Sequence, residues 1–64
     1  MYKLIVTING RESVVRTYKS IREARRKLKM NRNMYMREGK RVIIIGDCMY
    51  VTGENTNWKF VIKK

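Results

Sequence analysis

The sequence predicts a small α+β domain in which one helix packs on one face of an antiparallel sheet, in the order ββαβββ. Two turn signals, at residues 9–10 and 46–47, are each flanked by runs of β-branched residues and indicate two hairpins. A helix-start signal at Ser20 lies between them. The 64 residues have room for one domain, 1–64, and a chain this short buries only about 60% of its unfolded surface. We therefore expect packing alone, or an oligomer, to hold the fold together.

The first hairpin is predicted from residues 2–18, where apolar runs flank Asn9-Gly10. This dipeptide favours a type I′ turn, which requires a positive φ at both central residues. A two-residue turn places Tyr2, Leu4, Val6 and Ile8 on one face with Val15 and Thr17, and Lys3, Ile5, Val14 and Arg16 on the other. Because Val14 and Val15 are both apolar, the pattern leaves open a register one residue away.

The helix is predicted to start at Ile21, after a capping-box pattern formed by Ser20 and Glu23. In such a box the serine oxygen accepts a hydrogen bond from the backbone, and the glutamate reaches back to the cap. Ile21, Ala24 and Leu28 share one side of this helix and give it a narrow apolar stripe. We expect this stripe to lie on the sheet.

The end of the helix is predicted between Met30 and Asn33, because Asn31 and Asn33 interrupt the helical pattern. The helix would then be only about 15 Å long and would depend on the sheet for stability. Residues 34–37 are predicted to form a short strand before a turn at Glu38-Gly39.

The second hairpin is predicted from strands 41–45 and 48–52 on either side of Gly46-Asp47. Glycine at the first turn position suits a type II′ turn. Residues 53–57 are rich in Gly and Asn and are predicted to be a loop. The last strand, 58–63, alternates Trp58, Phe60 and Ile62 with Lys59, Val61 and Lys63, so we expect the first set to face the core.

The charge is strongly one-sided, with 16 Lys and Arg residues against 5 Asp and Glu residues and a net charge of +11. Most of the basic residues lie in the segment 16–41. Self-repulsion at this charge destabilises a compact domain, and a polyanionic partner would offset it. Acidic residues increase solubility more than basic ones, so solubility alone is a poor explanation for a positive net charge. We therefore expect the protein to bind an anionic partner.

One side of the predicted helix carries Arg22, Arg25, Arg26 and Lys29 within an arc of about 100°. Solvated helix faces usually alternate in sign, whereas like charges three and four residues apart repel. The pattern favours a site for phosphates, because Arg and Lys neutralise them and release counterions. The predicted binding residues are Arg16, Lys19, Arg22, Arg25, Arg26, Lys29, Arg32 and Arg37.

Two tyrosines lie among these basic residues. Tyr18 stands between Arg16 and Lys19, and Tyr35 between Arg32 and Arg37. Aromatic rings interleaved with cations can stack on the bases of a single strand. A tyrosine at the edge of the core, with its hydroxyl in water, is the alternative interpretation. Trp58 and Phe60 are predicted to belong to the core.

The run 16–28, RTYKSIREARRKL, passes from a strand into a capped helix. It resembles the hairpin-to-helix junction of integrase arm-DNA-binding domains, which pack one helix on a three-stranded sheet whose strands bind DNA. The resemblance covers these residues alone, and the chain departs from that pattern because at least three strands follow its helix. It implies that Arg11, Arg16 and neighbouring strand residues contact DNA in place of the helix.

The residue inventory argues against an enzyme, a metal site or a cofactor. There is no histidine, and the single cysteine, Cys48, rules out an internal disulfide and is expected to be a small buried hydrophobe. The five acids stand singly at predicted turns or in the helix cap: Glu12, Glu23, Glu38, Asp47 and Glu54. No carboxylate pair or activated nucleophile is available for catalysis.

No apolar run approaches the roughly 18 residues of a membrane span, and residues 1–8 are too short and weakly charged for a signal peptide. We therefore expect a soluble cytoplasmic protein with no membrane partner. A lone thiol without a disulfide framework fits the same reducing compartment.

Three functional hypotheses follow. The first is a small protein that binds DNA or RNA through phosphates, largely without sequence specificity, using the basic helix face. The second is an inhibitor or adaptor, of the kind found in phages and mobile elements, that docks its basic face on an acidic surface of a partner protein. The third is a homodimer that pairs an open strand edge such as 58–63 and so enlarges a marginal core.

Overall fold

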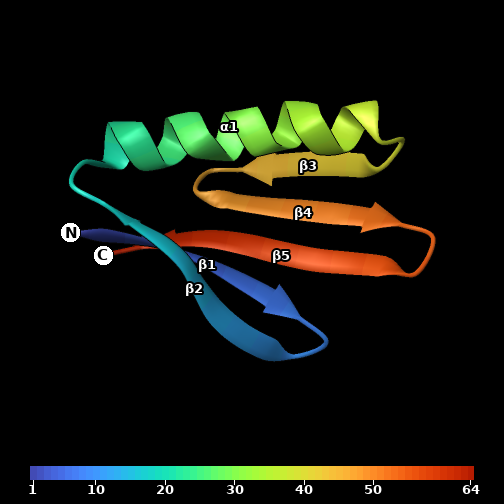
Figure 1. The fold of residues 1–64 in the computed structure, drawn as a ribbon, viewed down its shortest axis with the longest axis horizontal. Coiled ribbons are helices and arrows are strands. Elements are labelled where there is room, and N and C mark those ends of the chain that lie inside the picture. The colour runs from blue at the N-terminus through green and yellow to red at the C-terminus, as the bar shows by residue number, and fades with distance from the viewer.

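A computed structural model describes all 64 residues and has one helix and a single five-stranded sheet. The elements follow the predicted order ββαβββ, so the predicted α+β fold is confirmed. Their bounds are β1 Tyr2–Ile8, β2 Arg11–Tyr18, α1 Ile21–Arg37, β3 Arg41–Ile45, β4 Cys48–Gly53 and β5 Thr56–Lys63. Across the sheet the order is β2-β1-β5-β4-β3, with every neighbouring pair antiparallel (Figure 1).

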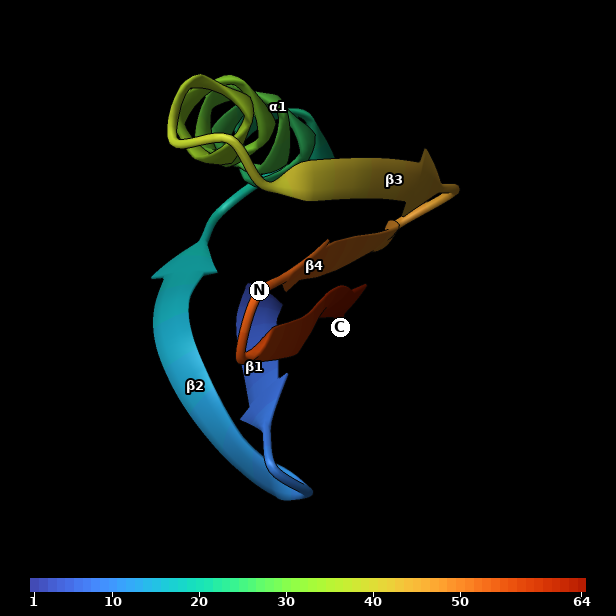
Figure 2. The ribbon, with the colours of Figure 1, turned by 90° about the vertical axis from the view of Figure 1, so that its right-hand side faces the viewer.

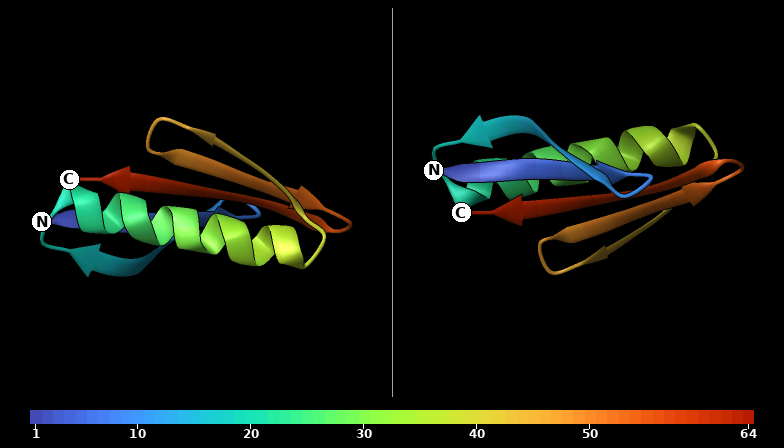
Figure 3. Two further views of the ribbon diagram at one scale, coloured as in Figure 1. Left: turned by 90° about the horizontal axis from the view of Figure 1, so that it is seen from above. Right: turned by 90° about the horizontal axis from the view of Figure 1, so that it is seen from below.

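The sheet is strongly curved, and α1 lies on its concave side (Figure 2). The helix runs along the length of the sheet, and the two chain ends lie close together at the same end of the molecule (Figure 3). With a single helix, the opposite, convex face of the sheet remains uncovered. We call it the open face.

The hydrophobic core lies between α1 and the concave side of the sheet. Its members are Leu4, Ala24, Leu28, Met49, Val51, Phe60 and Ile62. Phe60 and Ile62 are buried and Trp58 packs against the core, which confirms the predicted inward face of the last strand. This core places the start of α1 beside the end of β2.

The helix is longer than the sequence predicted. It extends to Arg37 and has 17 residues, so the predicted end between Met30 and Asn33 and the predicted strand 34–37 are both wrong. The ring of Tyr35 packs on Trp58 and Phe60, with centroid distances of 5.5 and 5.9 Å. This packing outweighs the weak helix propensity of the two asparagines, which amounts to less than about 1 kcal/mol each.

The predicted turns are confirmed, and one is tighter than expected. Asn9 and Gly10 have φ values of 53° and 80°, as a type I′ turn requires. Gly46 has a φ of 60° and the next residue has a negative φ, which fits the type II′ turn. The predicted loop 53–57 shortens to a two-residue turn with Asn55 at a φ of 60°, because strand pairing continues on both sides of it.

A β-bulge changes the predicted register of the first hairpin. Pairing is regular from the turn as far as Ile5 and Val14, but the next pair is Leu4 with Arg16, so Val15 is an extra residue in β2. Arg16 therefore shares the face of Leu4 and Thr17 that of Lys3, so the predicted faces of Arg16 and Thr17 are wrong. The Val14–Val15 pair, which left the register open, is the place where it shifts.

Two further predictions need correction. The strand predicted as an open edge, 58–63, belongs to β5 and is central, with β1 and β4 on either side. In a central strand, the alternating apolar side chains can pack against those of a neighbouring strand on each side. The free edges of the sheet belong to β2 and β3. Cys48 is half-buried instead of buried, because its side chain lies on the open face. The one helix, α1, lacks the length and apolar character that a membrane-spanning helix needs.

Candidate anion-binding surface

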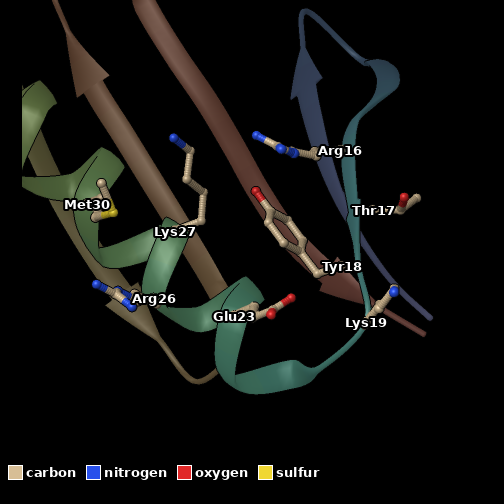
Figure 4. A pocket seen from close by; sticks show the side chains of 8 residues that line it. All are labelled: Arg16, Thr17, Tyr18, Lys19, Glu23, Arg26, Lys27 and Met30. Atoms are coloured by element: carbon tan, nitrogen blue, oxygen red, sulfur yellow. The ribbon is translucent and has the colours of Figure 1, made fainter.

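A groove of about 530 Å³ lies between the end of β2 and the first turns of α1 (Figure 4). Its lining residues are Arg16, Thr17, Tyr18, Lys19, Glu23, Arg26, Lys27 and Met30. Four of these side chains are cationic and one is acidic. We call this site the basic groove.

The bulge and the helix cap together build the basic groove. Because Val15 is an extra residue, Arg16 and Tyr18 turn toward the side of the sheet that carries the helix. Oγ of Ser20 accepts a hydrogen bond of 3.2 Å from the N–H of Glu23, so the helix begins with only two residues between it and the end of β2. Only this half of the predicted capping box forms, and the carboxylate of Glu23 lines the groove instead.

Tyr18 forms one wall of the basic groove. Its ring packs against the core, and the guanidinium carbon of Arg16 lies 6.0 Å from the ring centroid. The hydroxyl is buried without a hydrogen-bond partner and lies toward the middle of the groove in Figure 4. An unpaired buried hydroxyl costs about 1–3 kcal/mol.

The predicted basic helix face divides into free and paired cations. Arg22, Arg26 and Lys29 are exposed and lie within 4.0 Å of no carboxylate. Arg25 differs, because its Nε donates a 2.8 Å hydrogen bond to Oδ1 of Asp47 in the β3–β4 turn. This hydrogen bond lowers the pKa of Asp47 and raises that of Arg25. Three of the four predicted cations are therefore free to meet a ligand.

Arg32 and Arg37 lie farther along α1 and do not line the basic groove. Arg32 is half-buried; one guanidinium nitrogen is 3.4 Å from Oδ1 of Asn33, and its Nε is buried without a partner. Arg37 is exposed at the last helical position. At 1.5 Å per residue they stand about 9 and 16 Å beyond Arg26. Both could contact only the continuation of a ligand that leaves the groove.

The two predicted stacking tyrosines are separated. Tyr18 lines the basic groove, whereas Tyr35 packs on the two core aromatics of β5. Burial raises the pKa of the Tyr35 hydroxyl, with a smaller contribution from Glu38. Arg11, which the resemblance implied as a DNA contact, lies at the far end of β2 beside the first turn. The groove therefore combines one aromatic ring with residues from both β2 and the helix.

Lys27 is a groove residue that the sequence did not indicate. Its i+4 spacing from Glu23 is typical of a local ion pair, but the two ion pairs of the structure are Arg25–Asp47 and Lys40–Glu38. The lysine side chain is half-buried and extends along the groove (Figure 4). Its position depends on the bulge that brings β2 alongside the helix, which sequence periodicity does not show.

The chemistry available to this surface is the binding of anions. No three His, Cys, Asp or Glu side chains come together as a metal site. No known family, curated protein or solved structure matches the chain. The basic groove and the cations around it are therefore the features from which a function can be inferred.

Proposed function

We propose that this protein binds nucleic acid through its phosphate backbone, with the basic groove and the exposed cations beside it as the contact surface. The observation that supports this proposal is the convergence of Arg16 and Lys19 with Arg26 and Lys27 on one groove. These side chains come from both sides of the strand-to-helix junction, and none of them has an acidic partner within 4.0 Å. Arg22 and Lys29 extend the same surface along the helix.

Phosphate suits this arrangement better than a single small anion. Several cations along a groove can neutralise several consecutive phosphates, and each contact gains from counterion release. Arginine also presents two parallel donors to a phosphate. The lining has no Asn or Gln, the residues that read adenine edges. Binding is therefore proposed to depend little on sequence.

Fluorescence anisotropy tests the proposal, using labelled single- and double-stranded DNA and RNA from low salt to about 0.3 M. The test variant is Arg16→Ala/Arg26→Ala/Lys27→Ala. The matched control, Lys3→Ala/Lys59→Ala/Lys63→Ala, removes the same charge from the open face. At about 150 mM salt we expect the groove variant to lose at least about tenfold in affinity and to flatten the salt slope by about 0.9 per lost contact. The control should lose much less.

Equal losses of affinity in the two variants would show that net charge alone causes binding. They would contradict the assignment of the contact surface to the basic groove. Absence of binding to every nucleic acid near 150 mM salt would contradict the proposal itself. The same cations would then be assigned to an acidic protein surface, as the second hypothesis has it. Circular dichroism spectra that match the wild type would show that both variants remain folded.

A further inference from the structure

The open face of the sheet carries an unbroken row of apolar side chains across all five strands. The strand register places them opposite one another in the order Val14, Ile5, Val61, Cys48 and Ile45. We call this set the apolar row. Neighbouring strands lie about 4.8 Å apart, so the row is about 19 Å long.

The two ends of the apolar row are well exposed, with Val14 56% and Ile45 65% accessible, while its middle members are half-buried by their neighbours. Ile43 and Tyr50, 58% and 37% exposed, widen it at the β3 side. An antiparallel sheet with one solvated face normally alternates apolar residues inward with polar residues outward. A contiguous apolar patch on a solvated face is typical of an interaction site.

Cations flank the apolar row on both long sides. Lys3 and Lys63 are opposite each other on one side. Lys59 lies on the other side of the apolar row, and its ammonium is 5.8 Å from the ring centroid of Tyr50. Glu12 pairs with Thr7, which pairs with Lys59, so the side of Lys59 carries one cation and one acid. A complementary surface is therefore apolar along its middle and acidic on the side of Lys3 and Lys63, with one further carboxylate opposite Lys59.

The charges around the apolar row indicate which class of partner the open face can bind. A second copy would place lysines against lysines, and each chain carries a net charge of +11. The bases of a single strand would need aromatic rings to stack on an apolar surface, but the apolar row has none and Tyr50 stands alone beside it. An amphipathic helix presents an apolar stripe with a polar flank on either side. About 13 residues of helix match the length of the row.

We propose that the open face docks an acidic amphipathic helix of a partner protein, with its apolar stripe along the apolar row and its carboxylates against the flanking lysines. The bound helix would cover the bare side of the sheet and give a helix on both faces. The face is opposite the one that carries α1 and the basic groove, so this inference does not depend on the proposed nucleic-acid function. Together the two faces would make the protein a bridge between a nucleic acid and a protein.

The probe is a synthetic helical peptide of about 18 residues with a leucine stripe and glutamates on both flanks, and its counterpart has lysine at every glutamate. Amide shifts of the full-length protein are followed by two-dimensional NMR. We expect the acidic peptide to shift the amides of Ile5, Cys48 and Val61 with saturation, and the basic peptide to leave them unchanged. Slower reaction of the Cys48 thiol with Ellman's reagent in the presence of the acidic peptide would support the same site.

Three variants sharpen the test. Val14→Ser/Ile45→Ser removes the exposed ends of the apolar row and should weaken binding of the acidic peptide at least about fivefold. Lys3→Glu/Lys63→Glu should transfer the preference to the basic peptide. Arg22→Ala/Arg26→Ala/Lys29→Ala changes only the helix and should bind the acidic peptide as the wild type does.

The inference would be overturned by shifts confined to α1, by equal binding of the two peptides, or by full affinity of the serine variant. Shifts of the same amides with protein concentration alone would assign the face to a second copy. Shifts caused by single-stranded DNA or by phosphatidylglycerol vesicles, with no response to the acidic peptide, would assign it to those ligands. Loss of nucleic-acid binding in the groove variant is a separate result, so the two proposals can fail independently.

Discussion

Arg25 on α1 and Asp47 in the β3–β4 turn form an ion pair with an Nε–Oδ1 distance of 2.8 Å. Their side chains are 56% and 36% exposed, so solvent screens the attraction and the pair contributes little to stability. Its larger effect is on the charge of the helix, because it neutralises one of the cations beside the basic groove. Asp47 therefore reduces the positive potential of the surface proposed to bind phosphate.

We expect Asp47→Asn to strengthen nucleic-acid binding, because it frees Arg25 while asparagine remains compatible with the turn. The affinity should rise about two- to threefold near 150 mM salt, and the salt slope should steepen by up to about 0.9. Anisotropy titrations measure both. The matched control is Glu54→Gln, which makes the same charge change in the β4–β5 turn. An equal gain in the control would show that only net charge matters.

The same ion pair predicts how stability depends on pH at the acid end. The hydrogen bond from Arg25 lowers the pKa of Asp47 below its ordinary value of 3.8. A carboxyl group with a lowered pKa stabilises the fold above its unfolded pKa and loses that contribution as the pH falls through the folded one. The difference in melting temperature between wild type and Asp47→Asn should therefore be constant from about pH 7 to 5 and vanish near pH 2. A difference in melting temperature that persists at the lowest pH would mean that the substitution acts on the turn and not on the ion pair.

The features that the sequence predicted well are those encoded within a few residues. Asn9-Gly10 and Gly46-Asp47 specify their turns by backbone preference alone, and the serine cap starts the helix where it was expected. The helix end was missed because it depends on Tyr35, whose partners lie more than twenty residues away. Periodicity within the helix cannot show a contact of that range.

The candidate site shows the same difference between local features, which the sequence predicts, and long-range contacts, which it does not. The cations of the helix were identified by their spacing, but their convergence with Arg16 depends on the bulge at Val15. A bulge adds one residue to one strand, and two adjacent valines do not show which of them is extra. Lys27 was missed for the same reason, since the groove exists only once β2 has turned toward the helix.

Tyr35→Ala should destabilise the protein by about 2–4 kcal/mol, because it removes a ring packed on Trp58 and Phe60 and leaves a cavity. Met36→Ala is the control, because that side chain is 56% exposed and its loss should change stability by less than about 0.5 kcal/mol. Urea unfolding followed by circular dichroism measures both free energies. Equal and small effects would mean that the helix ends before Tyr35.

Gly10→Ala should cost about 1–2 kcal/mol, because the glycine has a φ of +80° and an L side chain is strained there. No atom lies within 4 Å of the added Cβ, so the cost comes from the backbone alone. Gly10→Asn should recover part of it, since asparagine tolerates this conformation.

Gly53→Ala is the control for that backbone effect. Its φ lies outside the left-handed region, and the new methyl group would meet the flexible side chain of Lys40 at 3.4 Å. We expect a change within about 1 kcal/mol of wild type, with a small gain if the loss of unfolded-state entropy dominates. Thermal and urea unfolding of the three variants measure these changes in stability. If Gly10→Ala and Gly53→Ala were equally stable, the first turn would not require a positive φ at Gly10, and the register that leads from it to the bulge at Val15 would be wrong.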